Sequence, residues 1–246
     1  MTEERDLILY YLRIHFSNQP EVELIDEQQE NINSMKKVVE LNPVLTAEER
    51  NILNVAYKNA VSSRRKALSD VAVLLKEEST GVRQERRVRL IQFRDVLLKE
   101  MHDICIDLIN LIDESLLPAS NEPEQRVYFE KMKGDYYRYI CENREGPEIE
   151  GIIEKASQCY QAGLDIARSE LNSTNPTFLG LVLNYSVFLY EIMDHKNEAI
   201  DLSQSTFNDT VDNIDNTDDA TYSETTLILR LLQTNHKNWI HERDNE

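Results

Sequence analysis

The sequence predicts an all-α protein of nine helices in antiparallel layers. Its 246 residues include only 6 Gly and 6 Pro, together about 5% of the chain against roughly 12% in average proteins. So few turn formers argue against a β-sandwich, a barrel or a glycine-rich nucleotide-binding fold. Apolar residues recur at helical spacing almost throughout. With 41% apolar and 29% charged residues, the chain is hydrophobic enough to build one large core or two small ones.

In the first half of the chain, breakers and caps separate four helical patterns. The first pattern ends at Asn18-Gln19-Pro20, and the second has sparse apolar residues and is only weakly amphipathic. Thr46 and Glu49 form a capping-box pattern, a hydroxyl followed three residues later by a carboxylate, that opens the third. Gly81 separates the third helix from the fourth. The four expected helices cover residues 3–16, 22–41, 46–78 and 82–117.

Five further helices are expected in the second half. Pro123 opens the first of them, and Gly146-Pro147 forms a loop after it. Asn175-Pro176 has the pattern of an N-cap followed by proline in the first helical turn. The acidic stretch 212–219 is expected to be a solvated turn before the last helix. These helices are expected at residues 123–143, 148–171, 175–193, 197–211 and 222–240, and short connections make them antiparallel neighbours.

Charge and composition exclude several classes of function. The formal charge is 27 − 45 = −18, which opposes binding to nucleic acid or anionic membranes. No run approaches the roughly 18 apolar residues of a membrane span, and no basic region precedes the N-terminal apolar run, so no secretory signal is expected. Three widely spaced cysteines indicate reduced core thiols in a protein of the cytoplasm or nucleus.

Signatures of catalysis are also missing from the sequence. The five histidines include no HExxH pair, no GxSxG elbow occurs, and Gly146 to Gly151 lacks the Lys-Ser/Thr of a phosphate loop. We therefore expect no metal, no cofactor and no enzymatic activity.

One basic cluster stands out on the third helix and consists of Lys58, Arg64, Arg65 and Lys66. Lys58 and Arg65 are seven residues apart, so they lie within about 20° of each other, two turns apart, with the small Ser62 between them. Such a face suits an approaching anion. The alternative is a solvated helix face that pairs with the many carboxylates of the chain.

A second candidate is the segment 128–139, in which four tyrosines surround Arg138. Arginine can bind a phosphate through two parallel hydrogen bonds, and a neighbouring phenol such as Tyr139 can add another. Arg138 and Tyr139 are therefore a candidate anion-binding pair. Tyrosines at helical spacing also occur as core packing, which is the alternative here.

These two segments, together with 175–192 and 226–239, resemble the 14-3-3 family. The similarity runs from Thr46 to Trp239, in order and with similar intervals. It implies a nine-helix fold with a concave groove that binds phosphoserine and phosphothreonine peptides, usually as a homo- or heterodimer, without enzymatic activity. The chain would then be an adaptor for phosphorylated proteins. The alternative is an all-helical scaffold that binds partners without phosphate.

The resemblance assigns roles to individual residues. The phosphate pocket would consist of Lys58, Arg65, Arg138 and Tyr139. The remaining peptide contacts would come from Lys131, Leu183, Asn184, Val187, Glu191, Leu227, Leu231, Asn235 and Trp239. Spacing supports one stripe on each of two helices, at i, i+3, i+7 from Asn184 and at i, i+4, i+8 from Leu227. Ordinary core packing is the alternative for the apolar members.

We expect a single domain over residues 1–246, with groove-forming helices over 46–239 and a short C-terminal tail at 240–246. Residues 1–45 depart most from the family and form the expected dimerisation region. The apolar run 7–12 is expected to be buried, either in a repacked dimer interface or against its own chain. Further departures from the usual family residues are Ser62, Leu68, Val96 and Asn238.

Overall fold

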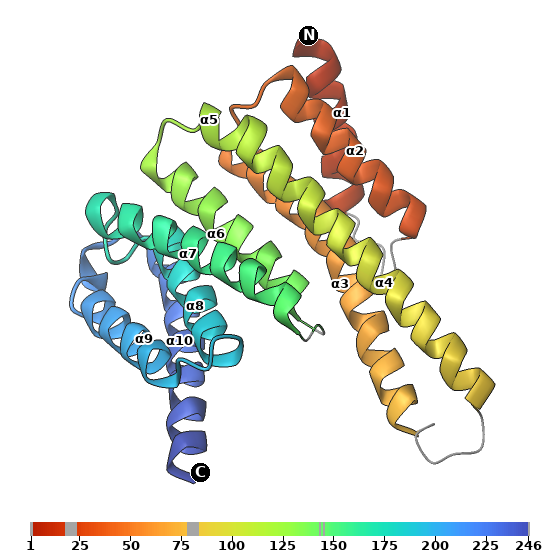
Figure 1. The fold of residues 1–246 in the computed structure, drawn as a ribbon. Coiled ribbons are helices and arrows are strands. Elements are labelled where there is room, and N and C mark those ends of the chain that lie inside the picture. Colours follow the sequence, from red (N-terminus) through yellow and green to blue (C-terminus); the bar gives the residue numbers. More distant parts are fainter. Residues whose placement is uncertain (1, 18–23, 78–83, 143, 145, 246) are drawn as a thin grey trace. The chain divides into compact units, whose positions relative to one another are not determined.

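The computed structural model describes residues 2–17, 24–77, 84–142, 144 and 146–245 (Figure 1). The chain divides into two compact units, Met1–Ala119 and Ser120–Glu246. All regular structure in the described ranges is helical, and nine of these helices have 16 residues or more. The all-α prediction is therefore confirmed.

The first unit consists of long helices in antiparallel contact. Helix α2 packs on α3, α3 packs on α4, and α1 contacts both α2 and α3. After α4 the chain continues through a π-helical turn, Ile112–Leu116, into the short α5. The helices span α1 Thr2–Ser17, α2 Ile25–Leu41, α3 Ala47–Glu77, α4 Gln84–Leu111 and α5 Leu117–Ala119.

The predicted capping box opens α3. The Thr46 backbone N–H donates to Glu49 Oε2 at 2.8 Å, and the Glu49 backbone N–H donates to Thr46 Oγ1 at 3.3 Å. Arg5 of α1 also pairs with Glu49 at 2.8 Å. Burial would raise the pKa of Glu49, but the hydrogen bond and charge of Arg5 and the bonds from Thr46 outweigh it and hold the pKa below its ordinary value. The cap therefore also ties α1 to α3. Gly81, the expected separator after α3, lies outside the described residues.

The N-terminal apolar run is divided between the inside and the outside of the first unit. Leu9 and Leu12 are buried against their own chain, whereas Leu7, Tyr10 and Tyr11 are more than half exposed. The expectation that the whole run is buried thus holds within this unit for its inward face only.

In the second unit, α8 is the central helix. It packs against α6, α7, α9 and α10, and its apolar residues form much of the core (Figure 1). The main helices are α6 Pro123–Cys141, α7 Glu150–Glu170, α8 Pro176–Glu191, α9 Lys196–Val211 and α10 Asp219–Asn245, with short 3₁₀ turns at Pro147–Ile149 and Ile214–Asn216.

Two side-chain caps fix where helices begin in this unit. Asn175 Oδ1 accepts from the backbone N–H groups of Thr177 and Phe178, which confirms the predicted cap of α8. Asp218 Oδ1 accepts from the N–H groups of Ala220 and Thr221, both at 3.0 Å. Because of this second cap, α10 begins at Asp219, three residues before the expected start. It also continues to Asn245, so the expected tail is helical as far as the structure describes it.

Cys105, Cys141 and Cys159 are buried thiols without disulfide bonds. Burial is the main cause that raises the pKa of Cys141, to about 11. Their predicted role as small core residues is confirmed. Across the described residues, no helix is long and apolar enough to cross a membrane. The same residues hold no group of three or more side chains that could bind a metal ion.

Candidate functional site

On α3, the basic residues of the predicted cluster have different surroundings. Lys58 is exposed and has no hydrogen-bond or ion-pair partner among the described residues. Arg65 is partly buried, and Ser62 between them is exposed. Arg64, by contrast, is buried and bonds to Gln28 of α2 and to Glu100 of α4. Arg64 therefore joins three helices, and Lys58 and Arg65 are the ligand candidates of this segment.

A hydrogen-bonded group around the buried Tyr57 holds α3 beside Lys58. The Tyr57 hydroxyl donates to Asp107 Oδ2 of α4 at 2.7 Å, and Lys36 of α2 forms an ion pair with the same carboxylate. Burial, followed by the hydrogen bond and charge of Asp107, raises the pKa of Tyr57 well above its ordinary value. The hydroxyl thus stays a donor, and the backbone that carries Lys58 is fixed against two neighbouring helices.

In the second unit, Asp135 of α6 is the centre of the polar site. The residue is only 5% exposed, and its carboxylate accepts from Lys131 Nζ at 2.8 Å, from the Tyr160 hydroxyl at 2.6 Å and from Asn184 Nδ2 at 2.8 and 2.9 Å. Burial alone would raise the pKa of Asp135. The charges of Lys131 and Arg138, with the hydrogen bonds, outweigh burial and lower it. Asp135 is therefore an ionised carboxylate that joins α6, α7 and α8.

Arg138 is held in place by neighbours on α6 and α7. Its Nη1 bonds to Glu142 Oε1 at 2.9 Å, its Nε donates to the Tyr160 hydroxyl at 3.4 Å, and its Cζ lies 4.8 Å from the centre of the Tyr139 ring. Burial opposes the charged form, but the hydroxyl of Tyr160 and the negative charge of Asp135 beside the guanidinium raise the pKa of Arg138 above its ordinary value. The third nitrogen, Nη2, has no hydrogen-bond partner among the described residues, so it remains a donor for an anion.

The close contact between α6 and α7 at this site depends on a glycine. A Cβ atom built on Gly134 would lie 2.8 Å from ring carbons of Tyr160, which is closer than van der Waals contact permits. Glycine at this position lets the Tyr160 ring approach α6 and brings its hydroxyl to Asp135.

The predicted stripe on α8 lies beside this polar site. Asn184 bonds to Asp135, Leu183 and Val187 are partly buried, and Glu191 at the end of the helix is exposed. The stripe therefore runs from the polar centre to the surface of the unit.

The stripe on α10 combines exposed leucines with a buried tryptophan. Leu227 and Leu231 are 61% and 47% exposed, and Asn235 is partly buried. Trp239 is only 6% exposed and stacks on Tyr190 with ring centres 4.7 Å apart. The leucines form an apolar surface, whereas Trp239 belongs to the core of the unit and supports the helix from beneath.

Sequence reasoning missed three supporting residues, Asp135, Glu142 and Tyr160. Asp135 stands four residues after Lys131 and three before Arg138, so all three lie on one helix face. A carboxylate at that position within a tyrosine-rich segment was the available signal. Tyr160 comes from another helix and offered no such spacing.

The four predicted phosphate ligands are divided between the two units. Lys58 and Arg65 belong to the first, and Arg138 and Tyr139 belong to the second.

Comparison with known proteins identifies the family of this chain. A family model described as "14-3-3 protein" matches residues 22–240, which includes most of both units. The chain belongs to the 14-3-3 family.

Similarity to individual 14-3-3 proteins extends over most of the chain. The chain is 40% identical over 206 residues to 14-3-3-like protein 2 of Caenorhabditis elegans, and the alignment covers 84% of this chain and 82% of that protein. It is 38% identical over 213 residues to 14-3-3 protein beta/alpha-A of Xenopus laevis, covering 87% and 86%. With 14-3-3-like protein C of Glycine max the identity is 35% over 238 residues, covering 97% and 90%.

Family membership decides the class of function. As a 14-3-3 protein, the chain is an adaptor that binds phosphorylated partner proteins, and it is not an enzyme. The expectation drawn from the sequence resemblance is thereby confirmed.

Proposed function

We propose that Lys58, Arg65, Arg138 and Tyr139 bind the phosphate of a phosphoserine or phosphothreonine segment together. In this proposal both units contribute to one pocket, and residues 1–246 act as a single 14-3-3 domain. The observation that carries the proposal is the hydrogen bonding of the Arg138 guanidinium. Its guanidinium is held by Glu142 and Tyr160, while Nη2 keeps its donors for a ligand.

The physical basis of phosphate selection is charge. A phosphate carries close to two negative charges at neutral pH, and each hydrogen bond to a charged group contributes roughly 1.5–3 kcal/mol net. Without a phosphate, gathering three cationic side chains would set like charges against one another, and Glu142 is the carboxylate that the structure pairs with Arg138. Repulsion among the empty ligands therefore adds to the selectivity for phosphorylated partners.

The rest of the peptide would lie along α6, α8 and α10. Asn184 and Asn235 are amides that can bond an extended peptide backbone without reading much of its sequence. The exposed leucines of α10 offer an apolar wall opposite these polar groups. The full proposed set of peptide-binding residues is Lys131, Leu183, Asn184, Val187, Glu191, Leu227, Leu231, Asn235 and Trp239.

Residues 1–45 are proposed to mediate dimerisation, and the exposed Leu7, Tyr10 and Tyr11 support this proposal because they would be covered in a dimer. A dimer would present two grooves, and doubly phosphorylated partners would gain affinity through effective concentration. We also propose that the protein works in the cytoplasm, since its three cysteines are buried thiols without disulfide bonds.

A fluorescence-polarisation titration tests the phosphate pocket. One peptide is prepared with and without its phosphate and titrated with the wild type, Arg65→Glu and Arg138→Glu. Each reversal should weaken binding of the phosphopeptide by about 100-fold or more, because two charge-assisted bonds of roughly 1.5–3 kcal/mol each are lost. Arg89→Glu in the first unit and Arg230→Glu in the second reverse exposed arginines outside the proposed set and should bind like the wild type. Binding that ignores both the phosphate and the reversals would contradict the proposal and indicate a phosphate-independent scaffold.

A further inference from the structure

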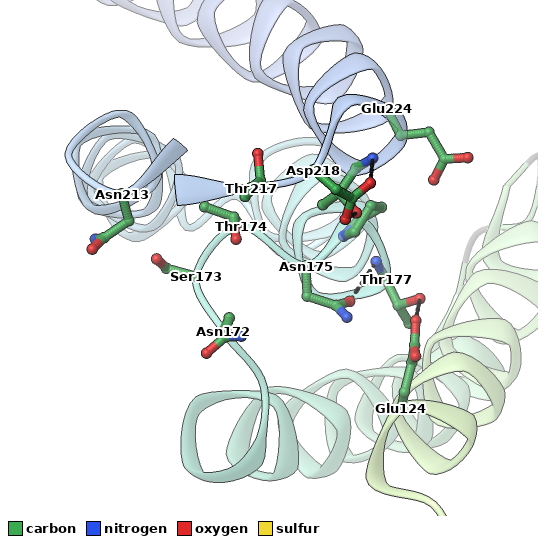
Figure 2. Close-up of a pocket in the computed structure, with 12 residues that line it drawn as sticks. Glu124, Asn172, Ser173, Thr174, Asn175, Thr177, Asn213, Thr217, Asp218 and Glu224 are labelled. Atoms are coloured by element: carbon green, nitrogen blue, oxygen red, sulfur yellow. Dashed lines mark hydrogen bonds between the residues drawn. The ribbon is translucent and has the colours of Figure 1, made fainter. Parts of the chain in front are cut away.

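A polar cleft of about 700 Å³ lies within the second unit, where α6, α8 and α10 begin (Figure 2). Its lining includes the carboxylates of Glu124, Asp218 and Glu224, together with hydroxyl and amide side chains from the α7–α8 and α9–α10 connections. The lining residues include no lysine, arginine or histidine. The cleft therefore has the opposite charge character to the proposed phosphate pocket.

The three carboxylates of the cleft have no basic partner among the described residues. Glu124 accepts a hydrogen bond from the Thr177 hydroxyl at 2.9 Å, and Glu224 is exposed. Asp218 accepts from the backbone N–H and the hydroxyl of Thr221, and these bonds lower its pKa. Glu124 and Asp218 are thus positioned by neutral donors, and the negative charge of the three carboxylates is left for a ligand.

Thr174 gives a second, independent indication of a ligand. Its side chain lies in the cleft lining although the residue is only 6% exposed. Its backbone carbonyl accepts from the Thr225 hydroxyl at 2.7 Å, but its own hydroxyl has no hydrogen-bond partner among the described residues. Figure 2 shows this hydroxyl directed into the hollow beside Ser173 and Asn175. The hydroxyl of this nearly buried residue opens onto the cleft without a protein partner and can therefore bond to whatever occupies the cleft.

The cleft and the proposed phosphate site lie along the same helix faces. On α6, Glu124, Lys131 and Arg138 follow one another at intervals of seven residues, which keeps them on one face. On α8, Thr177 and Asn184 have the same spacing. Hydrogen bonds join the two helices at both levels, from Thr177 to Glu124 in the cleft and from Asn184 to Asp135 beside Arg138.

The helix geometry gives the distance between the two sites. Fourteen residues separate Glu124 from Arg138, which corresponds to about 21 Å along α6 at 1.5 Å per residue. An extended peptide advances about 3.3–3.6 Å per residue. A peptide whose phosphate is bound at Arg138 would therefore bring a residue about six positions away to the level of the cleft.

We propose that this acidic cleft binds a lysine or arginine side chain of the partner, about six residues from the phosphorylated residue. This inference rests on the proposed phosphate site, to which it adds a second determinant of specificity at a fixed spacing. Three carboxylates supply the charge, and the Thr174 hydroxyl and neighbouring amides supply acceptors for the several N–H donors of a guanidinium or ammonium. A metal ion is a poorer occupant, because among the described residues the three carboxylates do not form a group that could hold one.

A series of phosphopeptides that carry a single arginine at successive positions tests this proposal. Peptides share one phosphoserine core in an alanine and serine background, and a single arginine is placed three to nine residues from the phosphoserine on either side. Affinity is measured by fluorescence polarisation at low salt. One position about six residues away should bind about fivefold tighter than the peptide without arginine, the upper range for an exposed ion pair.

The double variant Glu124→Gln/Glu224→Gln should abolish this gain and leave the affinity of the arginine-free phosphopeptide unchanged. The matched control Glu150→Gln/Glu170→Gln removes two exposed carboxylates of α7 that do not line the cleft, and it should keep the gain. A gain that is equal at every position, or that persists in the cleft variant, would overturn the proposal and leave only the general attraction of the net negative charge.

The same titrations separate this inference from the proposed function. Phosphate-dependent binding with no gain at any arginine position would refute the cleft alone. Binding of the arginine-free peptide that does not depend on its phosphate would refute the phosphate site, and with it the six-residue spacing.

Discussion

Replacing Asp135 with alanine is expected to destabilise the second unit strongly. The carboxylate is buried and is the common acceptor for Lys131, Tyr160 and Asn184. Alanine would leave the Lys131 ammonium without its carboxylate and the Arg138 guanidinium with the carboxylate of Glu142 alone. The Tyr160 hydroxyl would also lose its 2.6 Å acceptor inside the core.

The magnitude follows from the kind of interaction that is lost. Removing one partner of a buried ion pair costs about 3–5 kcal/mol, because the remaining charge stays buried and unpaired. Three separate donors lose their acceptor, but water can enter the space left by the carboxylate and recover part of the loss. We therefore expect the free energy of unfolding to fall by about 3–5 kcal/mol. The midpoint of thermal unfolding should drop by about 10 °C.

Urea denaturation followed by tryptophan fluorescence measures this effect in the correct unit. Trp239 is the only tryptophan of the chain and is buried against Tyr190 in the second unit. The matched control is Asp165→Ala on α7, an exposed aspartate whose side chain accepts from Gln161 at 2.7 Å. That control should change the free energy of unfolding by no more than about 0.5 kcal/mol. A loss below about 1 kcal/mol for Asp135→Ala, or one equal to the control, would refute the argument that this carboxylate holds the site together.

Two further predictions use the same urea titration. Gly134→Ala should destabilise the protein by about 1–3 kcal/mol, because its Cβ would lie 2.8 Å from the Tyr160 ring. The control Gly151→Ala places its Cβ in open space and should stabilise the protein by about 0.5–1 kcal/mol. Equal effects of the two substitutions would contradict the argument that α6 and Tyr160 are in close contact. Stability should also fall as the pH drops below about 4, because the pKa values of Asp135 and Glu49 are lower in the folded state. Their contribution is present above the unfolded pKa and is lost as the pH falls through the folded one. Asp135→Ala should therefore lose less stability between pH 6 and pH 3 than the wild type does, and an unchanged acid slope would argue against the lowered pKa of Asp135.

Local signals in the sequence explain why the helices could be predicted. The Thr46–Glu49 capping box and the Asn175-Pro176 cap depend on residues close in sequence, and both are present in the structure. The start of α10 lies three residues before the predicted one, because the acidic stretch 212–219 is not a turn along its whole length. Asp218 within that stretch instead caps the helix with its own side chain.

The supporting residues of the site depend on contacts between helices, which spacing along one helix does not reveal. Arg64 and Arg65 are adjacent and chemically identical, yet only the position of α2 and α4 makes Arg64 a buried link to Gln28 and Glu100. The Tyr160–Asp135 bond requires α7 to approach α6 at a glycine. The split of the N-terminal apolar run into a buried and an exposed face likewise follows from the packing of α1 on α2 and α3.

A double-mutant cycle on Arg65 and Arg138 tests most directly whether both units bind the same phosphate. The affinity of one phosphopeptide is measured for the wild type, Arg65→Ala, Arg138→Ala and the double variant, and the cycle is repeated without the phosphate. Residues that share a ligand group show coupling energies of about 0.5–3 kcal/mol, whereas independent sites are additive. We expect coupling in that range for the phosphopeptide and none for the unphosphorylated peptide. Additive losses for the phosphopeptide would contradict the shared pocket.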